Sequence, residues 1–218
     1  MDFKHIIWDF DGTLFDTYPH TASAFRIILK KEYGVAENVL EIEAQMRISM
    51  SNAYEFYKDK YEIDEGFWRR FKDFSALYEN QNAIPYNNIL MLCRFIFSQG
   101  LSNYLYTDRN KGVLSLLQKH GLYELFADFV TEENGFADTP DPSALNYLKD
   151  RHNMDKNQTI YIGDGAADLL CARNAGIKFC FFTEDVNRKL DADYTVQNFS
   201  DLYYIINSAL TKKINGNI

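Results

Sequence analysis

The sequence contains little cysteine and no long run of apolar residues. Its three cysteines, Cys93, Cys171 and Cys180, are widely spaced and lie in apolar surroundings, so we expect buried thiols in a reducing compartment and not a disulfide framework or a zinc site. A membrane helix needs about 18 consecutive apolar residues. Charged residues also interrupt the N-terminal segment, where a signal peptide would have its apolar core. These absences predict a cytoplasmic protein without a membrane span.

Positive charge is also scarce, because 31 acidic residues outnumber 23 basic ones and the formal net charge is -8. Nucleic acids and anionic membranes bind basic surfaces, so neither is an expected partner. A small anionic substrate would need a metal ion or local basic groups to hold it. What the chain does contain is 46% hydrophobic and 16% aromatic residues over 218 positions. This composition is typical of a globular domain, alone or with an insertion, and we expect a monomer or a homodimer.

Short apolar segments alternate with helical patterns over most of the chain, which is typical of a parallel β-sheet. The expected strands are residues 5–10, 103–107, 128–130, 159–163, 178–182 and 194–196. The expected helices are 17–33, 39–50, 53–61, 67–78, 89–97, 111–120, 142–151, 166–175 and 200–211. The sequence therefore predicts an α/β fold: a doubly wound parallel sheet from residues 1–16 and 85–218, with residues 17–84 inserted as a helical domain.

Two carboxylates follow the first expected strand. Its apolar start, His5-Ile6-Ile7-Trp8, is typical of a strand buried on both faces. Asp9 and Asp11 come directly after it, where the carboxyl ends of parallel strands form a ligand-binding crevice. Two buried carboxylates are costly unless a cation or a reaction uses them. The alternative is an ordinary polar turn, since Asp and Gly are common turn residues.

Two other strand ends carry polar residues that can face the same crevice. Thr107 ends the strand at 103–107 and supplies a hydroxyl and backbone N–H groups that can hold an anion, although it could also simply cap the next helix. Asp164 ends the strand at 159–163, and Asp168 follows four residues later at the start of a helix, so the two can converge. Close carboxylates repel one another, and all-oxygen ligation favours Mg²⁺.

The order of these motifs resembles a known family. Asp9-Phe10-Asp11-Gly12-Thr13, the strand end at Thr107, and Gly163-Asp164 with Asp168 look like the haloacid dehalogenase (HAD) superfamily. The helical insert directly after the first motif resembles the phosphoglycolate phosphatase-like and β-phosphoglucomutase-like branch. The resemblance implies a Rossmann-like core with an α-helical cap domain that closes over the crevice like a lid.

The resemblance also implies an activity, that of a Mg²⁺-dependent phosphatase acting on a small phosphorylated metabolite through an aspartyl-phosphate. Asp9 would be the nucleophile, and Asp11 would protonate the leaving group and then activate water. The implied Mg²⁺ ligands are Asp9, Asp11 through its backbone carbonyl, Asp164 and Asp168, the last directly or through water. The resemblance implies that Thr107 and nearby backbone amides bind the phosphate. We expect Asp108, Arg109 and Lys111 of the same loop to take part in phosphate binding. In the insert, Arg47 is a candidate for binding a substrate anion.

One family motif is absent. The family has a lysine in a Lys-Pro-x-Pro setting, and here the prolines remain while Thr139 occupies the lysine position beside Asp138. Losing one contact of this kind costs about 10² to 10³ in rate, unless Arg109 or Lys111 supplies the charge. Two hypotheses therefore stay open: a phosphatase of reduced activity, and a non-catalytic protein that binds a phosphorylated ligand or a protein partner. A mutase is a third option within the enzyme class.

Overall fold

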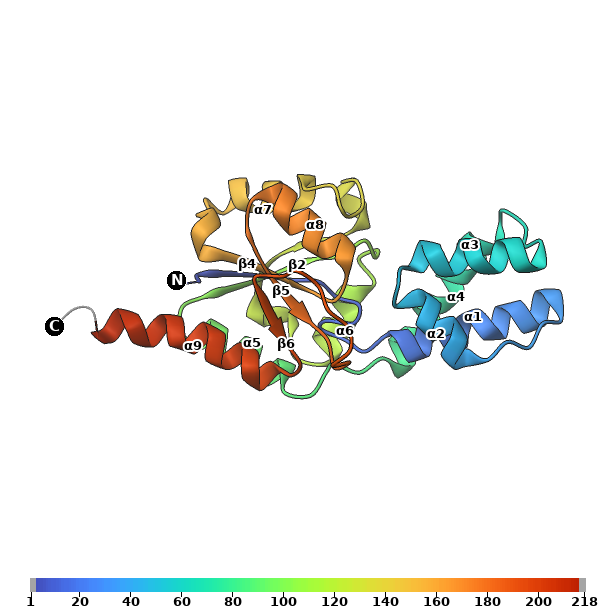
Figure 1. The fold of residues 1–218 in the computed structure, drawn as a ribbon, viewed down its shortest axis with the longest axis horizontal. Coiled ribbons are helices and arrows are strands. Elements are labelled where there is room, and N and C mark those ends of the chain that lie inside the picture. The colour runs from blue at the N-terminus through green and yellow to red at the C-terminus, as the bar shows by residue number, and fades with distance from the viewer. Residues whose placement is uncertain (1–2, 216–218) are drawn as a thin grey trace. The chain divides into compact units, whose positions relative to one another are not determined.

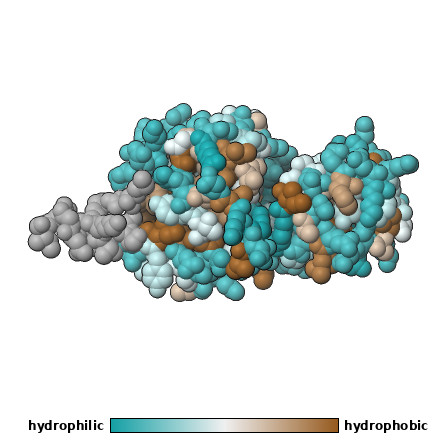
Figure 2. All heavy atoms as spheres, in the orientation of Figure 1, coloured by the Kyte–Doolittle hydropathy of each residue, from teal (hydrophilic) through white to brown (hydrophobic). Residues whose placement is uncertain are grey.

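The computed structural model describes residues 3–215, which cluster into two compact units. Of the described residues, 3–14 and 85–215 form one unit, and Phe15–Ile84 form the other. Among the described residues, none of the helices combines the length and the apolar character that crossing a bilayer requires. The face drawn in Figure 2 is mostly hydrophilic, with scattered hydrophobic side chains.

The first unit is built on a six-stranded sheet whose pairs are all parallel. Its strands are β1 (His5–Trp8), β2 (Ser102–Tyr106), β3 (Phe126–Val130), β4 (Thr159–Gly163), β5 (Lys178–Phe182) and β6 (Tyr194–Val196). They lie in the order β3-β2-β1-β4-β5-β6. Successive strands run outward from β1 on one side and outward from β4 on the other, so the topological switch point lies between β1 and β4. Ligands bind outside the strand ends at such a point.

Helices cover both faces of this sheet (Figure 1). The helices of this unit are α5 (Ile89–Ser98), α6 (Val113–Lys119), α7 (Ser143–Arg151), α8 (Ala166–Ala175) and α9 (Phe199–Asn215). α7 and α8 lie on one face, and α5 and α9 lie on the other. Ile6, Ile7 and Trp8 of β1 have no exposed surface, as their apolar run predicts for a central strand. The predicted doubly wound α/β fold is confirmed.

The second unit consists of helices in its described part. They are α1 (Tyr18–Tyr33), α2 (Val39–Met46), α3 (Met50–Tyr61) and α4 (Phe67–Asn82). An aromatic core joins them: the ring of Phe25 on α1 lies 5.4 Å from that of Tyr57 and 5.1 Å from those of Phe67 and Phe71, measured between centroids. The aromatic stripe of this segment therefore packs the unit itself.

Several expected boundaries are wrong, each for a local reason. β1 ends at Trp8 and not at residue 10, because the chain turns and the N–H of Leu14 donates to the Phe10 carbonyl. The helix expected at 39–50 ends at Met46, and α3 begins after Ser49, whose hydroxyl accepts the Asn52 N–H as an N-cap. Such turns and hydroxyl caps depend on local hydrogen bonds, which the periodicity of apolar residues does not predict.

Lys111 does not begin the helix after β2. α6 begins at Val113, because the Asn110 side chain accepts the N–H of Gly112 and holds residues 110–112 in a turn. β2 likewise ends at Tyr106, one residue earlier than expected, so that Thr107 lies in the loop. Its N–H still donates to the Val130 carbonyl of the neighbouring strand β3. Thr107 therefore keeps the position of a strand end.

Candidate active site

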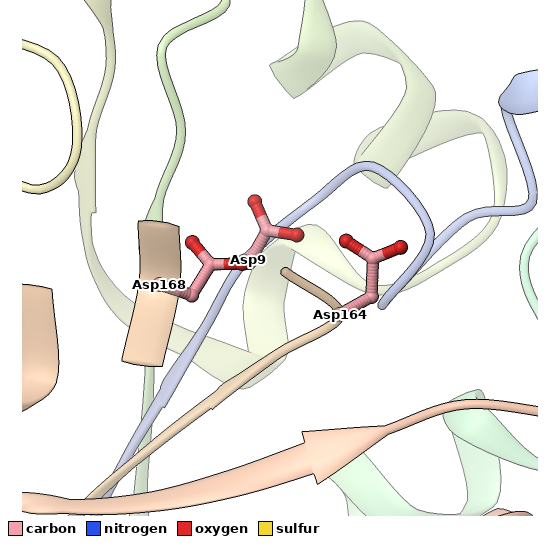
Figure 3. A group of neighbouring side chains, drawn as sticks. All are labelled: Asp9, Asp164 and Asp168. Carbon is pink, nitrogen blue, oxygen red and sulfur yellow. The ribbon is translucent and has the colours of Figure 1, made fainter. Parts of the chain in front are cut away.

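The first two acidic motifs meet at the switch point of the sheet. Trp8 and Ile162 are paired in register on β1 and β4, and the N–H of Asp9 donates to the Ile162 carbonyl at 2.9 Å. Asp9 and Asp164 follow directly after these neighbouring strands. Asp168 comes from the first turn of α8, and the three carboxylates gather at one place (Figure 3). Sequence spacing predicted this convergence.

The three carboxylates are close enough to share a cation. One oxygen from each of Asp9, Asp164 and Asp168 lies within 4.8 Å of the others. Only 5% of the surface of Asp164 and 8% of that of Asp168 is exposed. Burial, followed by the charges of Asp168, Asp164 and Asp11, raises the pKa of Asp9 well above its ordinary 3.8. A divalent cation would reverse this shift, because it favours the ionised carboxylates. The donor set therefore fits a hard cation that takes oxygen ligands.

Two hydrogen bonds fix the Asp168 carboxylate. The Tyr161 hydroxyl donates to Oδ1 at 2.9 Å, and the Gly165 N–H donates to Oδ2 at 3.1 Å. Burial raises the pKa of Asp168 to about 6, and these two hydrogen bonds act in the opposite direction. Gly163 is necessary for the arrangement, since a Cβ at this position would lie 2.7 Å from the Asp168 carboxyl carbon.

A threonine orients the first aspartate. The Thr13 hydroxyl donates to Asp9 Oδ2 at 2.9 Å, and Thr13 has no exposed surface. Gly12, with φ of 71°, makes the turn between the aspartates and Thr13. Thr13 belongs to the first sequence motif, but the motif by itself does not indicate this role. The one available signal was the four-residue spacing from Asp9, which a tight turn brings into contact.

The second aspartate contacts an arginine of the β2 loop. Nε of Arg109 lies 2.5 Å from Oδ2 of Asp11, and only about a fifth of either side chain is exposed. The Arg109 guanidinium carbon lies 5.8 Å from the ring centroid of Phe10, and the Arg109 N–H donates to Thr107 Oγ1 at 3.2 Å. The expected phosphate-binding loop and the first motif are thus joined directly.

The other two residues of that loop lie further outside. Asp108 and Lys111 are exposed, and the Lys111 N–H donates to the Glu133 carboxylate at 2.8 Å. Asp108 is near enough to contribute to the raised pKa of Asp168. A phosphate-binding role for Asp108 and Lys111 stays a prediction.

Comparison with known proteins decides the family of this chain. The family model of the haloacid dehalogenase-like hydrolases matches residues 6–182. The chain belongs to this family. A phosphoglycolate phosphatase of Vibrio parahaemolyticus is 25% identical and aligns over 94% of this chain and 97% of its own length. The pyrophosphatase PpaX of Halalkalibacterium halodurans is 23% identical over 94% of this chain and 98% of its own length.

A solved structure shows the same fold. The HAD-superfamily hydrolase of subfamily IA, variant 1, from Geobacter sulfurreducens superposes with a TM-score of 0.72 at 16% identity, covering 94% of this chain and 96% of that one. The resemblance to HAD hydrolases that the motifs indicated is therefore confirmed, together with the Rossmann-like fold class.

Thr139 lies where the resemblance to the family predicts a lysine. Thr139 is half-buried in the loop before α7, and its peptide bond to Pro140 is cis. Asp138 beside it is exposed. Sequence reasoning missed a different cation, Arg188, whose Nη2 donates to the Asp164 carbonyl at 2.7 Å and whose Nη1 lies 3.7 Å from Asp164 Oδ2. Arg188 lies in the loop after β5, far from every motif, so the sequence offered no signal for it.

Arg47, the candidate in the insert, already contacts two carboxylates of its own unit. Its guanidinium donates to Glu43 at 2.7 Å, lies 3.5 Å from Asp16 and stacks over the ring of Tyr18 at 4.6 Å from the centroid. A substrate anion would have to compete with both carboxylates for this arginine. Its role in binding substrate stays a prediction.

Proposed function

We propose that this HAD hydrolase is a Mg²⁺-dependent phosphatase that hydrolyses a small phosphorylated metabolite through an aspartyl-phosphate at Asp9. The observation that carries the proposal is the convergence of Asp9, Asp164 and Asp168 within 4.8 Å, with Asp11 two residues from the first of them. The names of the relatives, a phosphoglycolate phosphatase and a pyrophosphatase, support hydrolysis of a phosphate ester or anhydride.

The metal ligands would be the carboxylates of Asp9 and Asp164 and the backbone carbonyl of Asp11, with Asp168 binding directly or through water. These are all oxygen donors, which is the chemistry that Mg²⁺ prefers. When bound, Mg²⁺ neutralises an acidic pocket that would otherwise repel a phosphate dianion. Arg188 would hold the Asp164 loop in place through its bond to the Asp164 carbonyl.

The reaction would proceed in two displacements at phosphorus. A carboxylate oxygen of Asp9 attacks, the bond from phosphorus to the ester oxygen breaks, and Asp11 gives a proton to the departing alkoxide. Asp11 then takes a proton from water as the water oxygen attacks the aspartyl-phosphate, which releases inorganic phosphate and restores the Asp9 carboxylate. The Thr107 hydroxyl and nearby N–H groups would bind the phosphoryl oxygens, and Thr13 keeps the Asp9 carboxylate oriented through its 2.9 Å hydrogen bond.

The substrate is a small phosphorylated metabolite, and the relatives make 2-phosphoglycolate and pyrophosphate the first compounds to assay. We place the reaction in the cytoplasm. Cys93, Cys171 and Cys180 support that location, because all three are buried free thiols, as expected in a reducing compartment.

Phosphate release from these two compounds, p-nitrophenyl phosphate and a set of sugar phosphates tests the proposal, with Mg²⁺ and with chelator. We expect Mg²⁺-dependent turnover that Asp9→Asn abolishes and that Asp150→Asn, an exposed aspartate on α7, leaves intact. If the wild type releases no phosphate but binds inorganic phosphate with Mg²⁺, the protein is instead the non-catalytic binder to which Thr139 points.

A further inference from the structure

The acidic site carries more negative charge than one divalent cation can balance. One oxygen from each of Asp9, Asp164 and Asp168 lies within 4.8 Å of the others, and the charge of Asp11 also raises the pKa of Asp9. A phosphate monoester brings up to two further negative charges. Thr139 is neutral where the family pattern has a lysine. Electrostatic stabilisation of the transferring group is usually the largest contribution to catalysis of this kind. The proposed reaction would therefore require a basic side chain elsewhere in the chain to supply the missing positive charge.

Arg188 and Lys111 fit this requirement poorly. Arg188 is committed to the Asp164 loop, with one nitrogen on the backbone carbonyl at 2.7 Å and its guanidinium over the ring of Phe181 at 5.4 Å. Lys111 is exposed, where solvent screens its charge, and its backbone N–H is bound to Glu133. Arg188 thus supports the metal-binding loop, and Lys111 lies at the exposed border of the site.

Arg109 contacts both parts of the site that a phosphoryl group would touch. Its backbone N–H donates to the hydroxyl of Thr107, the expected phosphate ligand, at 3.2 Å. Its Nε lies 2.5 Å from Asp11 Oδ2, beside the expected acid and base. The side chain is only 20% exposed and lies 5.8 Å from the face of Phe10, so its charge is screened less than that of a surface residue.

We propose that Arg109 is the cation that binds the transferring phosphoryl group in this protein and supplies the charge that Thr139 lacks. The proposal rests on the phosphatase function proposed above. Arginine suits the task because its guanidinium stays charged and its planar set of N–H donors matches two phosphate oxygens at once. Without substrate, Asp11 and Phe10 hold the guanidinium at the border of the phosphate loop, so binding requires little reorganisation.

Turnover of p-nitrophenyl phosphate by a set of variants tests the assignment. Arg109→Gln is expected to lower kcat by about 10² to 10³, with a smaller change in KM, as for loss of one transition-state donor. Arg109→Lys keeps the charge and is expected to recover at least about tenfold of that loss. Adding Thr139→Lys to Arg109→Gln is expected to raise kcat again. Arg94→Gln, on the exposed face of α5 in the same unit, is the matched control.

Three results would overturn the assignment. The first is an Arg109→Gln protein that keeps kcat within about threefold of wild type. The second is loss of turnover in Lys111→Gln while Arg109→Gln stays active. The third is an Arg109→Gln, Thr139→Lys double variant no faster than Arg109→Gln alone, although its circular dichroism and thermal melt match wild type.

A binding measurement separates this assignment from the phosphatase function itself. Calorimetric titration of inorganic phosphate in the presence of Mg²⁺ needs no turnover. Arg109→Gln is expected to weaken phosphate binding at least about tenfold relative to wild type and Arg94→Gln. If the wild type turns nothing over but shows this loss, the phosphatase function fails and the assignment of Arg109 stands. Equal phosphate affinity in wild type and Arg109→Gln would refute the assignment.

Discussion

Replacing Gly163 by alanine would place a methyl group against the side chain of Asp168, the third carboxylate of the acidic cluster. The added Cβ would lie 2.7 Å from both Cγ and Oδ2 of Asp168 and 2.8 Å from its Cβ. Rotation of the carboxylate cannot relieve the clash, because Cβ of Asp168 is itself too close and both oxygens are held, one by Tyr161 and the other by the Gly165 N–H. The chain must therefore shift α8 or break these hydrogen bonds.

The expected cost follows from these contacts. Overpacking of this kind destabilises a core by about 1 to 3 kcal/mol, and a lost hydrogen bond to a charged group adds about 1.5 to 3 kcal/mol. We expect Gly163→Ala to lower the free energy of unfolding by about 3 to 6 kcal/mol. Mg²⁺ affinity should fall about 10- to 100-fold, as when the support of a metal ligand is disturbed.

Urea unfolding and Mg²⁺ titration measure the two effects. Gly135→Ala is the control for the change of residue type, because its added Cβ meets nothing within 4 Å and only the positive φ of 72° is strained. It should cost about 1 kcal/mol, the usual order for a glycine replacement, and leave Mg²⁺ affinity unchanged. If Gly163→Ala is no more destabilising than this control and binds Mg²⁺ equally well, Asp168 does not close the cluster in the way described.

Three further outcomes follow from the same geometry. Burial raises the pKa of Asp168 to about 6 in the folded, metal-free protein, above its ordinary 3.8, so the folded state binds the proton more tightly than the unfolded state. In chelator, the free energy of unfolding should therefore fall by about 2 to 4 kcal/mol as the pH rises from about 4 to 6. Saturating Mg²⁺ should remove most of that fall. A free energy of unfolding in chelator that does not change over this pH range would contradict the effect of burial on Asp168. Thr13→Val keeps the shape of a fully buried side chain but removes the hydrogen bond to Asp9. It should lower kcat about tenfold at unchanged KM, because one hydrogen bond to a charged group contributes a free energy of this order. An unchanged kcat would show that Asp9 needs no orienting partner. In the helical insert, Glu79 has no exposed surface and accepts a hydrogen bond from the Thr21 hydroxyl at 2.6 Å. In urea unfolding, Glu79→Ala should therefore destabilise the protein by about 2 to 4 kcal/mol, and Glu79→Gln should cost less. Equal costs for the two variants would refute a hydrogen-bonding role for Glu79.

The fold was predictable because short apolar segments typical of strands alternate along the chain with the apolar periodicity of helices. The strands at 159–163, 178–182 and 194–196 and the helix at 166–175 have the expected bounds, since runs such as Thr159-Ile160-Tyr161-Ile162 end at glycine or polar residues. The boundaries that were missed depend on local hydrogen bonds: the side-chain contacts of Ser49 and Asn110, and the backbone turn in which the Leu14 N–H donates to the Phe10 carbonyl. The pattern of apolar residues carries no information about such contacts.

The candidate site was predictable only in its acidic half. Asp9 and Asp164 could be placed together because each follows a strand end, and parallel strand ends meet at one edge of a sheet. Asp168 could be added because it lies four residues after Asp164, at the start of a helix. The basic half could not be placed in this way. Arg109 and Lys111 are equally basic and two residues apart, and only the path of the turn decides that Arg109 contacts Asp11. Arg188 depends on a loop conformation that carries no motif.

The most direct measurement for the central claim is detection of the covalent intermediate. Wild-type protein is mixed with Mg²⁺ and a substrate that the phosphate-release assay identifies, quenched in acid during turnover, and digested for mass spectrometry. An aspartyl-phosphate mechanism predicts the mass of one added phosphoryl group on the peptide that contains Asp9, and its absence both in chelator and in the Asp9→Asn protein. Turnover without this adduct, or an adduct on any other residue, would contradict Asp9 as the nucleophile.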